Sequence, residues 1–386
     1  MNILIVTTSY PRNSNDMSGI FIKRLAVAMK QSCEKITVIA PGYANVEKKQ
    51  YDIDNGINVI RFPYAPKPLM QIAYGTGGIP ENLKSNPYLY ALVPFFLISL
   101  IFHIIKFSKY CDVIHANWLF TGLCALPAAK IRKKPLIITL RGSDFKKKES
   151  KLFIFLSKFV DTITTVNEQW ATDLTKKLHC KVFYTPNGVA IPEQQKDDSI
   201  IDFDSKTVKV LYVGTLSFTK GSDILAKVIA IAHKIPEIKF IVAGPGTPEK
   251  FGLDVLPNVI LEGFVPPEQV FKLYESTDIF ILLSRHEGRP NTLLEAMASG
   301  LPCIATKLPG VCEVINKECG IIVDIDNPLQ MVEAISELAK NPEKRKQMGI
   351  NAKKRIKELS LDWNSSASNY LKIFQEAICV RNSGHS

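Results

Sequence analysis

Short apolar runs alternate with segments of helical periodicity in the first half of the chain. The runs that we expect to form strands are NILIVTTSYP, ITVIAP, GINVIRFP, DVIHAN, PLIITL and TITTVN, and IFIKRLAVAMK is typical of a helix. Strands that are apolar throughout and alternate with helices are typical of a parallel sheet covered on both faces. The first half is therefore predicted to be a doubly wound α/β domain.

A second series of the same kind follows residues 186–206, a polar tract that contains proline and many acidic residues and resembles a linker. Its predicted helix covers residues 223–234, and its predicted strands are VKVLYVG, KFIVAGPG, NVILEGF, DIFILLS, PCIAT and GIIV. We therefore predict two Rossmann-like domains in tandem, residues 1–190 and 191–363. The tail DWNSSASNYLKIFQEAI is predicted to be a final helix, exposed at Lys372 and Glu376.

Residues 88–105 form a continuous apolar run that contains no acidic residue, lysine or arginine. Its length is marginal for a membrane span. A span is disfavoured because Pro94 and His103 interrupt the run, and because the run lies between predicted strands of one sheet. We favour a buried or half-buried helix, and a helix lying in the plane of a membrane is the alternative.

Charge is distributed unevenly over a chain with a formal net charge of +11. Residues 1–190 contain 25 Lys and Arg against 12 Asp and Glu, whereas residues 191–386 contain 23 against 25. The first half is therefore expected to face a polyanion, and lysine clusters at 130–134 and 146–148 favour an anionic membrane surface. The eight cysteines form no C-x-x-C pair, which favours reduced core thiols in a cytosolic protein, and no leader peptide is recognised at the start.

The segment SRHEGRPNTLLEAMASGLPCIAT carries the most specific chemistry. Glu287 is expected in a loop after a buried strand, and Glu295 about one turn into the helix that follows. The start of that helix offers unpaired N–H groups and partial positive charge, which suit a phosphate. The carboxylates on either side are instead suited to accept hydrogen bonds from the hydroxyls of a sugar or ribose.

Three further glycine-containing loops follow predicted strands of the second domain. Gly214 begins a loop in which Lys220 is suited to neutralise a diphosphate, and Gly244 lies in AGPG. The backbone at Phe264 and Val265 is suited to contact a nucleobase, although a plain turn is equally compatible. Neither a Walker loop nor G-x-G-x-x-G is present. The loops share the edge where doubly wound sheets bind ligands.

Three Asp-x-Asp pairs, at 52–54, 202–204 and 324–326, have a metal-binding spacing, but all are expected in loops or linkers and we expect no metal. His115 follows an apolar run and is expected to be either a core histidine or an acceptor contact. Asp144 is expected either to contact the acceptor or to cap the next turn.

These segments resemble family 4 glycosyltransferases of the GT-B fold over essentially the whole chain. SGIF, DVIHANW, ITLRGSD, TPNGV, VGTLSFTKG, AGPG, EGF, the two-glutamate segment and LPGVCEVI occur in that family's order. The resemblance is greatest to bacterial enzymes of lipopolysaccharide, capsule or exopolysaccharide synthesis. It implies two domains with a cleft between them, an acceptor-binding N-terminal domain, and a terminal helix of about residues 364–386 that packs back on that domain.

The resemblance also implies a retaining, metal-independent transfer of a hexose-type sugar, most simply from a UDP-sugar, to a lipid-linked or glycan acceptor at the inner membrane face, with no nucleic acid partner. Glu287 would lie beside the donor sugar, Glu295 would hold the ribose, and Lys220 would contact the diphosphate. The other implied donor contacts are Gly19, Gly214, Thr215, Gly244, Phe264, Val265, Pro290, Asn291, Thr292 and Leu293.

The chain departs from the family at two positions. The family often has histidine where this chain has Arg141, and arginine where this chain has Thr215. Our hypothesis is that Arg141 partly replaces the missing arginine as a catalytic cation. A non-catalytic, membrane-associated sugar-nucleotide-binding protein of the same fold is the alternative function.

Overall fold

The structure is a computed structural model that describes residues 1–13, 15–44, 51–74, 78–141, 144, 150–192, 207–235 and 237–383. The chain divides into two compact units, Met1–Asn187 with Trp363–Ser386, and Gly188–Asp362. The expected domain boundaries were 190/191 and 363/364. The lysine run 146–148, the Asp-x-Asp pair at 202–204 and most of the expected linker lie outside the described residues.

The first unit contains a sheet of eight strands in the order β3-β4-β2-β1-β5-β6-β7-β8, in which only β3 runs antiparallel to its neighbour. Its strands are β1 (Asn2–Val6), β2 (Lys35–Pro41), β3 (Tyr51–Asp54), β4 (Ile57–Phe62), β5 (Val113–Asn117), β6 (Leu136–Leu140), β7 (Thr162–Thr165) and β8 (Lys181–Tyr184). Its helices are α1 (Ile20–Lys30), α2 (Gly78–Ser85), α3 (Val93–Ser108), α4 (Leu119–Arg132), α5 (Lys151–Leu156), α6 (Glu168–Thr175) and α13 (Trp363–Ser383), with single 3-10 turns η1 (Lys67–Leu69), η2 (Pro87–Leu92) and η4 (Ser157–Phe159).

The second unit contains a parallel sheet in the order β11-β10-β9-β12-β13-β14. Its strands are β9 (Val208–Val213), β10 (Ile238–Ala243), β11 (Val259–Gly263), β12 (Ile279–Leu282), β13 (Cys303–Thr306) and β14 (Gly320–Val323). Its helices are α7 (Ser222–Ala232), α8 (Pro267–Glu275), α9 (Asn291–Ala298), α10 (Pro309–Cys312), α11 (Pro328–Lys340) and α12 (Pro342–Glu358), with 3-10 turns η5 (Phe218–Lys220) and η6 (Pro248–Phe251).

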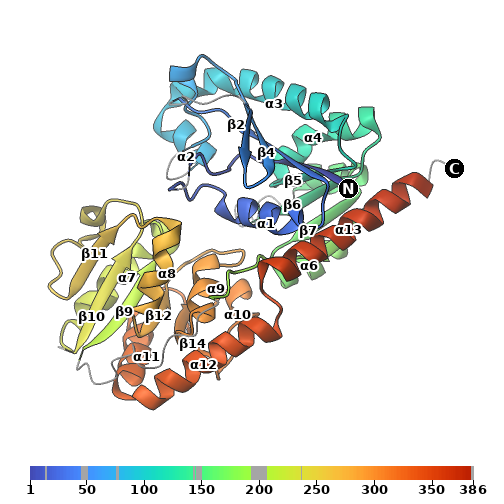
Figure 1. Cartoon of the computed structure of the whole chain (residues 1–386). Helices are drawn as coiled ribbons and strands as arrows, with labels where there is room; N and C mark the ends of the chain where they lie inside the picture. Colours follow the sequence, from blue (N-terminus) through green and yellow to red (C-terminus); the bar gives the residue numbers. More distant parts are fainter. Residues whose placement is uncertain are drawn as a thin grey trace. The chain divides into compact units, whose positions relative to one another are not determined.

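Each sheet separates two apolar cores, as buried strands require. In the first unit, α3 and α4 supply the core on one face, which includes Phe96 and Leu100, and α1 and α13 supply the core on the other face. Helix α13 runs beside α1 (Figure 1), and its Tyr370 and Phe374 are fully buried. In the second unit, α7 and α11 cover one face, and α8, α9 and α12 cover the other.

Four local predictions were wrong. The first strand ends at Val6 rather than at Tyr10, because Thr7 Oγ1 donates to the carbonyl of Ser9 and turns the chain out of the sheet. The pair Asp52–Asp54 lies in strand β3 rather than in a loop. Strands β3 and β8 were not anticipated, although Asn55-Gly56 between β3 and β4 is a typical hairpin turn. Cys312 and Cys379 are exposed, so not every thiol belongs to the core.

The contact between Gly221 and Leu283 provides a test of what holds the second sheet's loops. Gly221 has φ +74°, and a Cβ added there would lie 2.1 Å from the carbonyl oxygen of Leu283. Gly252 has a similar φ of +67°, but a Cβ there would have nothing within 4 Å. Substituting each glycine by alanine therefore distinguishes two costs. Both variants have the strain of a positive φ, but only the Gly221 variant also forces the two loops apart.

We expect Gly252→Ala to lower the free energy of unfolding by about 1 kcal/mol, the cost of positive φ alone. We expect Gly221→Ala to lower it by about 3 kcal/mol or more, because two backbone segments must also separate. Urea unfolding of both variants checks this difference. Equal losses of unfolding free energy in the two variants would contradict the view that the contact between Gly221 and Leu283 stabilises the second unit.

Candidate functional site

The loop after β9 holds Lys220 in a short 3-10 turn. Ser217 begins that turn, and its hydroxyl accepts a hydrogen bond from the N–H of Lys220. The N–H of Ser217 in turn donates to the hydroxyl of Ser222 at 2.9 Å. Gly221, in left-handed conformation, then starts α7. Hydrogen bonds of Ser217 and Ser222 within the loop thus fix the backbone position of Lys220.

Glu287 lies in the loop after β12, as predicted from the sequence. Its Oε1 atom is 2.5 Å from Nζ of Lys220 and accepts a hydrogen bond of 2.9 Å from the hydroxyl of Ser284. The Glu287 side chain is 12% exposed and that of Lys220 is 35% exposed. The structure therefore brings together Lys220 and Glu287, two of the three predicted catalytic residues, with the Lys220 ammonium group still accessible to solvent.

Arg285, which the sequence analysis did not single out, fastens the Lys220 loop to the Glu287 loop. Its N–H donates to the carbonyl of Thr219 at 2.9 Å, and its guanidinium lies 3.8 Å from the centre of the Phe218 ring. The same guanidinium donates to both carboxylate oxygens of Asp223, at 2.7 and 2.8 Å, and lies 2.7 Å from Asp326. Arg285 is a positioning residue, and nothing in its residue type marked it as one.

Helix α9 begins at Asn291 after Pro290, which has no side chain able to cap it. The backbone N–H groups of Asn291, Thr292 and Leu293 therefore form the first turn, at the positively polarised end of the helix. Glu295 is 6% exposed and accepts a hydrogen bond of 3.2 Å from the Tyr274 hydroxyl. Tyr274 was not predicted, and its hydrogen bond orients the carboxylate that we assigned to ribose.

The remaining predicted donor residues lie at the same edge of the sheet, after β9, β10 and β11. A Cβ at Gly244 would lie 2.0 Å from the carbonyl oxygen of Gly214, and the N–H of Gly244 donates to the carbonyl of Gly263 at 2.6 Å. The carbonyl of Thr215 lies 3.5 Å from the buried Tyr212 hydroxyl. Phe264 is 46% exposed, while Val265 packs against the core.

Arg141, in the first unit, is buried and held by side-chain amides. Its Nε and Nη2 donate to Oδ1 of Asn117 at 3.0 and 2.7 Å, and its Nη1 donates to Oδ1 of Asn187 at 2.8 Å. Burial lowers the pKa of this guanidinium below its ordinary value, with the nearby Asp144 acting in the opposite direction. These contacts join β5, β6 and the end of the unit. A catalytic role for Arg141 stays a prediction.

His115 lies in the core of the first unit, which is one of the two roles that we expected for it. His115 is fully buried in β5, where its Nε2 lies 2.7 Å from the Thr139 hydroxyl and its ring packs against Tyr370 and Phe374 of α13. Burial, reinforced by the charge of Arg141, lowers the pKa of His115 to about 3. The core alternative is the correct one, because α13 covers this strand.

Asp144 and Gly19 have structural partners of their own. The Asp144 carboxylate accepts hydrogen bonds from the N–H groups of Arg141 and Leu119, the first residue of α4. Gly19 precedes α1 with φ +69°, and a Cβ there would lie 2.2 Å from the carbonyl oxygen of Ser9. We expected Asp144 either to contact the acceptor or to cap the next turn, and that turn lies outside the described residues. Contact of either residue with a substrate stays a prediction.

No cluster of three or more histidine, cysteine, aspartate or glutamate side chains able to hold a metal ion occurs among the residues that the structure describes. Asp326, from the pair at 324–326, is instead paired with Arg285.

The Arg285–Asp223 pair makes stability depend on pH. Hydrogen bonds from Arg285 lower the pKa of Asp223 below its ordinary value of 3.8. The pair therefore stabilises the folded state at neutral pH and loses its effect as the pH falls below 3.8 through the folded-state pKa. We expect Asp223→Asn to be less stable than wild type at pH 7, by about 1 kcal/mol or less because Asp223 is partly exposed. Urea unfolding should show that the difference in stability between Asp223→Asn and wild type becomes smaller toward pH 3. A difference that does not change with pH would contradict this prediction.

Comparisons with known proteins agree with the geometry of both units. Residues 18–191 match the model described as Glycosyltransferase Family 4, and residues 193–355 match the model described as Glycosyl transferases group 1. An uncharacterised glycosyltransferase of Methanocaldococcus jannaschii is 23% identical, over 98% of this chain and 99% of the relative.

Two further similarities give more detail. An Escherichia coli enzyme named UDP-Gal:alpha-D-GlcNAc-diphosphoundecaprenol alpha-1,3-galactosyltransferase is 27% identical, over 69% of this chain and 79% of the relative. The structure of Anabaena HepE in complex with UDP and glucose superposes with a TM-score of 0.71 at 16% identity, over 97% of this chain and 99% of that one. With both units matched in order, the chain belongs to glycosyltransferase family 4 and has the GT-B fold.

Proposed function

We propose that this glycosyltransferase moves a hexose-type sugar from a UDP-sugar to a lipid-linked or glycan acceptor, with retention of configuration, in the synthesis of a cell-surface polysaccharide such as lipopolysaccharide. The observation that carries the proposal is the Lys220–Glu287 pair beside the start of α9, at the carboxyl edge of the second sheet. The name of the Escherichia coli relative and the UDP bound in the HepE structure support UDP as the nucleotide, and the name of the relative supports a lipid-linked acceptor.

The departing UDP carries the charge that catalysis must stabilise. Nζ of Lys220 has three N–H donors and gives one to Glu287, so two are available to a diphosphate. The N–H groups of Asn291, Thr292 and Leu293 add the helix dipole beside it. These fixed positive groups support a reaction that needs neither a metal ion nor another cofactor.

Glu287 acts in this proposal by positioning rather than as a nucleophile. Its Oε1 is engaged by both Lys220 and Ser284, which fixes the position of the carboxylate. A carboxylate held in this way is suited to orient Lys220 and to accept a hydroxyl of the donor sugar. Retention then follows if the acceptor attacks from the side of the leaving group, as the family resemblance implies. Glu295, oriented by Tyr274, is proposed to bind the ribose.

We expect Lys220→Met to lower kcat/KM for UDP-sugar turnover by about 100- to 1,000-fold, since one pre-organised cation beside the leaving group is lost. Lys227→Met, which removes an exposed lysine of α7, is the matched control and should be neutral. Turnover of a panel of UDP-sugars, followed by UDP release, is measured with and without EDTA. Unchanged turnover in Lys220→Met, or its loss in EDTA, would contradict the proposed mechanism.

We also propose that the protein is cytoplasmic and binds the inner face of the membrane through the first unit. Among the described residues, Pro87–Ser108 is the one helical stretch long and apolar enough to cross a membrane, and 28% of its most apolar 18 residues are buried. Phe96, Leu100 and Ile104 pack into the core, so a span would remove them from it. The eight cysteines, all free thiols, fit a reducing compartment.

The opposite side of α3 carries the features of a membrane contact. Phe95, Ile98 and Phe102 are 60, 67 and 58% exposed, and Lys106 and Lys109 follow on the same side of the helix. The spacing of the three apolar residues puts them on one face. Exposed aromatic rings accompanied by lysines fit the boundary of an anionic bilayer, where the rings enter the apolar layer and the ammonium groups meet lipid phosphates.

We expect the full-length protein to sediment with vesicles of phosphatidylcholine and phosphatidylglycerol, and Lys106→Ala/Lys109→Ala to bind them about 10- to 30-fold more weakly at low salt. Phe95→Ser/Ile98→Ser/Phe102→Ser should lose binding even where salt screens the lysines. Val255→Ser/Leu329→Ser/Ile350→Ser removes equally exposed apolar side chains of the second unit and is the matched control. Equal binding by both triple variants would exclude the α3 face.

A further inference from the structure

The second sheet ends at a strand edge that no step above uses. Strand β14 is the last strand in the order of that sheet and pairs with β13 alone among the described residues. A groove of about 550 Å³ borders this edge, lined by residues 321–324, by residues of α11, and by Lys307 and Cys312. We propose that the groove binds an extended segment of a partner protein, which adds to the sheet as a strand and carries basic side chains.

The main chain of β14 offers hydrogen-bonding groups on its open side. Successive residues of a strand direct their N–H and C=O groups to opposite edges. The carbonyl of Val323 accepts a hydrogen bond of 2.8 Å from the N–H of Lys307, which follows β13. Val323 and Ile321 therefore face β13, and Ile322 faces the open side. No hydrogen bond among the described residues uses the N–H or C=O of Ile322, so an added strand can pair with both.

Two contacts limit the length of the open edge. The N–H of Gly320 donates to the carbonyl of Asn316 at 3.1 Å, and the N–H of Asp324 donates to Oε1 of Gln330 at 2.8 Å. Nε2 of Gln330 donates in return to the Asp324 carboxylate at 3.1 Å. The open main-chain groups lie between these two contacts, so the groove suits a short extended segment.

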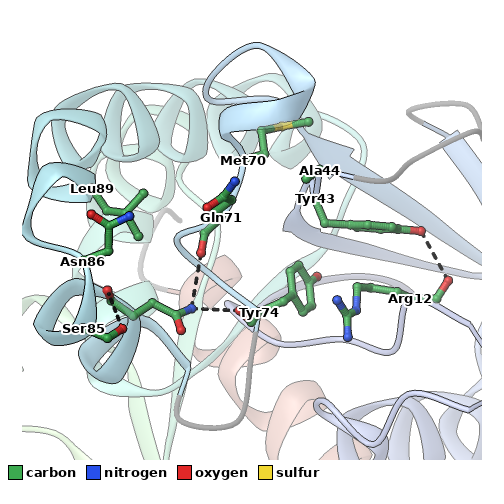
Figure 2. Close-up of a pocket in the computed structure, with 10 residues that line it drawn as sticks. Arg12, Tyr43, Ala44, Met70, Gln71, Tyr74, Ser85, Asn86 and Leu89 are labelled. Carbon is green, nitrogen blue, oxygen red and sulfur yellow. Dashed lines mark hydrogen bonds between the residues drawn. The ribbon is translucent and has the colours of Figure 1, made fainter.

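The pocket of the first unit in Figure 2 differs from this groove in its main chain. Its volume is about 360 Å³, and none of its described lining residues belongs to a strand. Carbonyl oxygens beside it already accept hydrogen bonds, those of Ile72 and Tyr74 from Nδ2 of Asn82 and that of Arg12 from the Tyr43 hydroxyl. Recognition through an open main chain is therefore a property of the β14 groove and not of this pocket.

The composition of β14 is not that of a strand protected against pairing. Exposed edges are commonly blocked by charged residues or proline within the strand. Ile321, Ile322 and Val323 are instead consecutive β-branched apolar residues, the types that favour strand pairing. The Ile322 side chain is 37% exposed, whereas Val323 belongs to the core beneath α11. The acidic residues of the groove lie outside the strand, where they can meet the side chains of an added strand.

The charge of the groove indicates which side chains the added strand carries. Asp324, Glu333 and Glu337 face the one cation among the described lining residues, Lys307. Glu333 and Glu337 are exposed and one turn apart on α11, where like charges repel. Glu337 pairs with Lys344, whereas Glu333 makes no ion pair among the described residues. Pairing with β14 of a second copy would bring two acidic grooves together, while a basic segment relieves the repulsion.

The two faces of the sheet predict an alternating pattern in the bound segment. Ile321 and Val323 lie on the face that α11 covers, so Ile322 lies on the opposite face. Successive side chains of an added strand also point to opposite faces. Those on the α11 face meet Glu333 and Glu337, and those between them meet Ile322. Lysine or arginine alternating with valine or isoleucine is therefore the pattern that fits.

The test measures the binding of a fluorescent peptide of alternating lysine and valine to the full-length protein, by fluorescence anisotropy at low salt. A second peptide has the same side chains but is N-methylated throughout, so it has no main-chain donors. Glu333→Lys reverses one charge of the groove, and Glu275→Lys, at an exposed glutamate of α8, is the matched control for net charge. Ile322→Pro removes the open-side N–H and no hydrogen bond of the sheet, so this variant should fold.

We expect wild type and Glu275→Lys to bind the first peptide, and Glu333→Lys and Ile322→Pro to bind it about tenfold more weakly. The N-methylated peptide should not bind. Absence of binding to wild type up to about 1 mM peptide, or equal binding by the two lysine variants, would overturn the proposal. Equal binding of both peptides would exclude strand addition. A wild-type dimer in sedimentation velocity that Ile322→Pro dissociates would assign the edge to a second copy and would also overturn the proposal.

Discussion

The close contact of backbones at the carboxyl edge of the second sheet is the constraint on which the candidate site depends. Gly221 meets the carbonyl of Leu283, and Gly244 meets that of Gly214, each at a distance that no side chain allows. Gly310 meets Gly288 in the same way. These contacts draw the loops after β9, β10 and β12 together. Lys220 and Glu287 are far apart in sequence. They become neighbours because glycines occupy the positions where one loop contacts the backbone of the next.

Side chains then convert this proximity into a fixed geometry. Arg285 lies between the two loops and pairs with both Asp223 and Asp326, while Lys220 pairs with Glu287. Arginine suits this task because its planar guanidinium stacks on Phe218 while donating at its edge. The loops of the first unit are held in another way. Arg61 and Asn82 donate to backbone carbonyl oxygens, and Arg141 donates to the side-chain amide oxygens of Asn117 and Asn187.

Periodicity was sufficient to predict most strands, because buried parallel strands are apolar throughout and are separated by glycine and proline. It was also sufficient to place Glu287 in a loop and Glu295 in a helix, since both positions follow from one strand and one helix start. It failed at β8, a short edge strand whose pattern resembles a loop. Periodicity also could not identify Arg285 as a positioning residue, because its partners are distant in sequence and meet it only in the folded chain. His115 was ambiguous because the helix that covers it lies at the far end of the chain.

The excess positive charge of the first half can now be divided according to what each cation contacts. Arg12, Arg61 and Arg141, at the carboxyl edge of the sheet, are engaged by a carboxylate, by carbonyl and hydroxyl oxygens, or by side-chain amides. Lys106, Lys109, Lys130 and Lys158 lie instead over aromatic rings of α3, of α5 and of the turns that follow them. A polyanionic substrate would require uncompensated charge at the ligand edge. The four lysines beside aromatic rings lie on the outer helices instead, which supports the proposed contact with an anionic membrane surface.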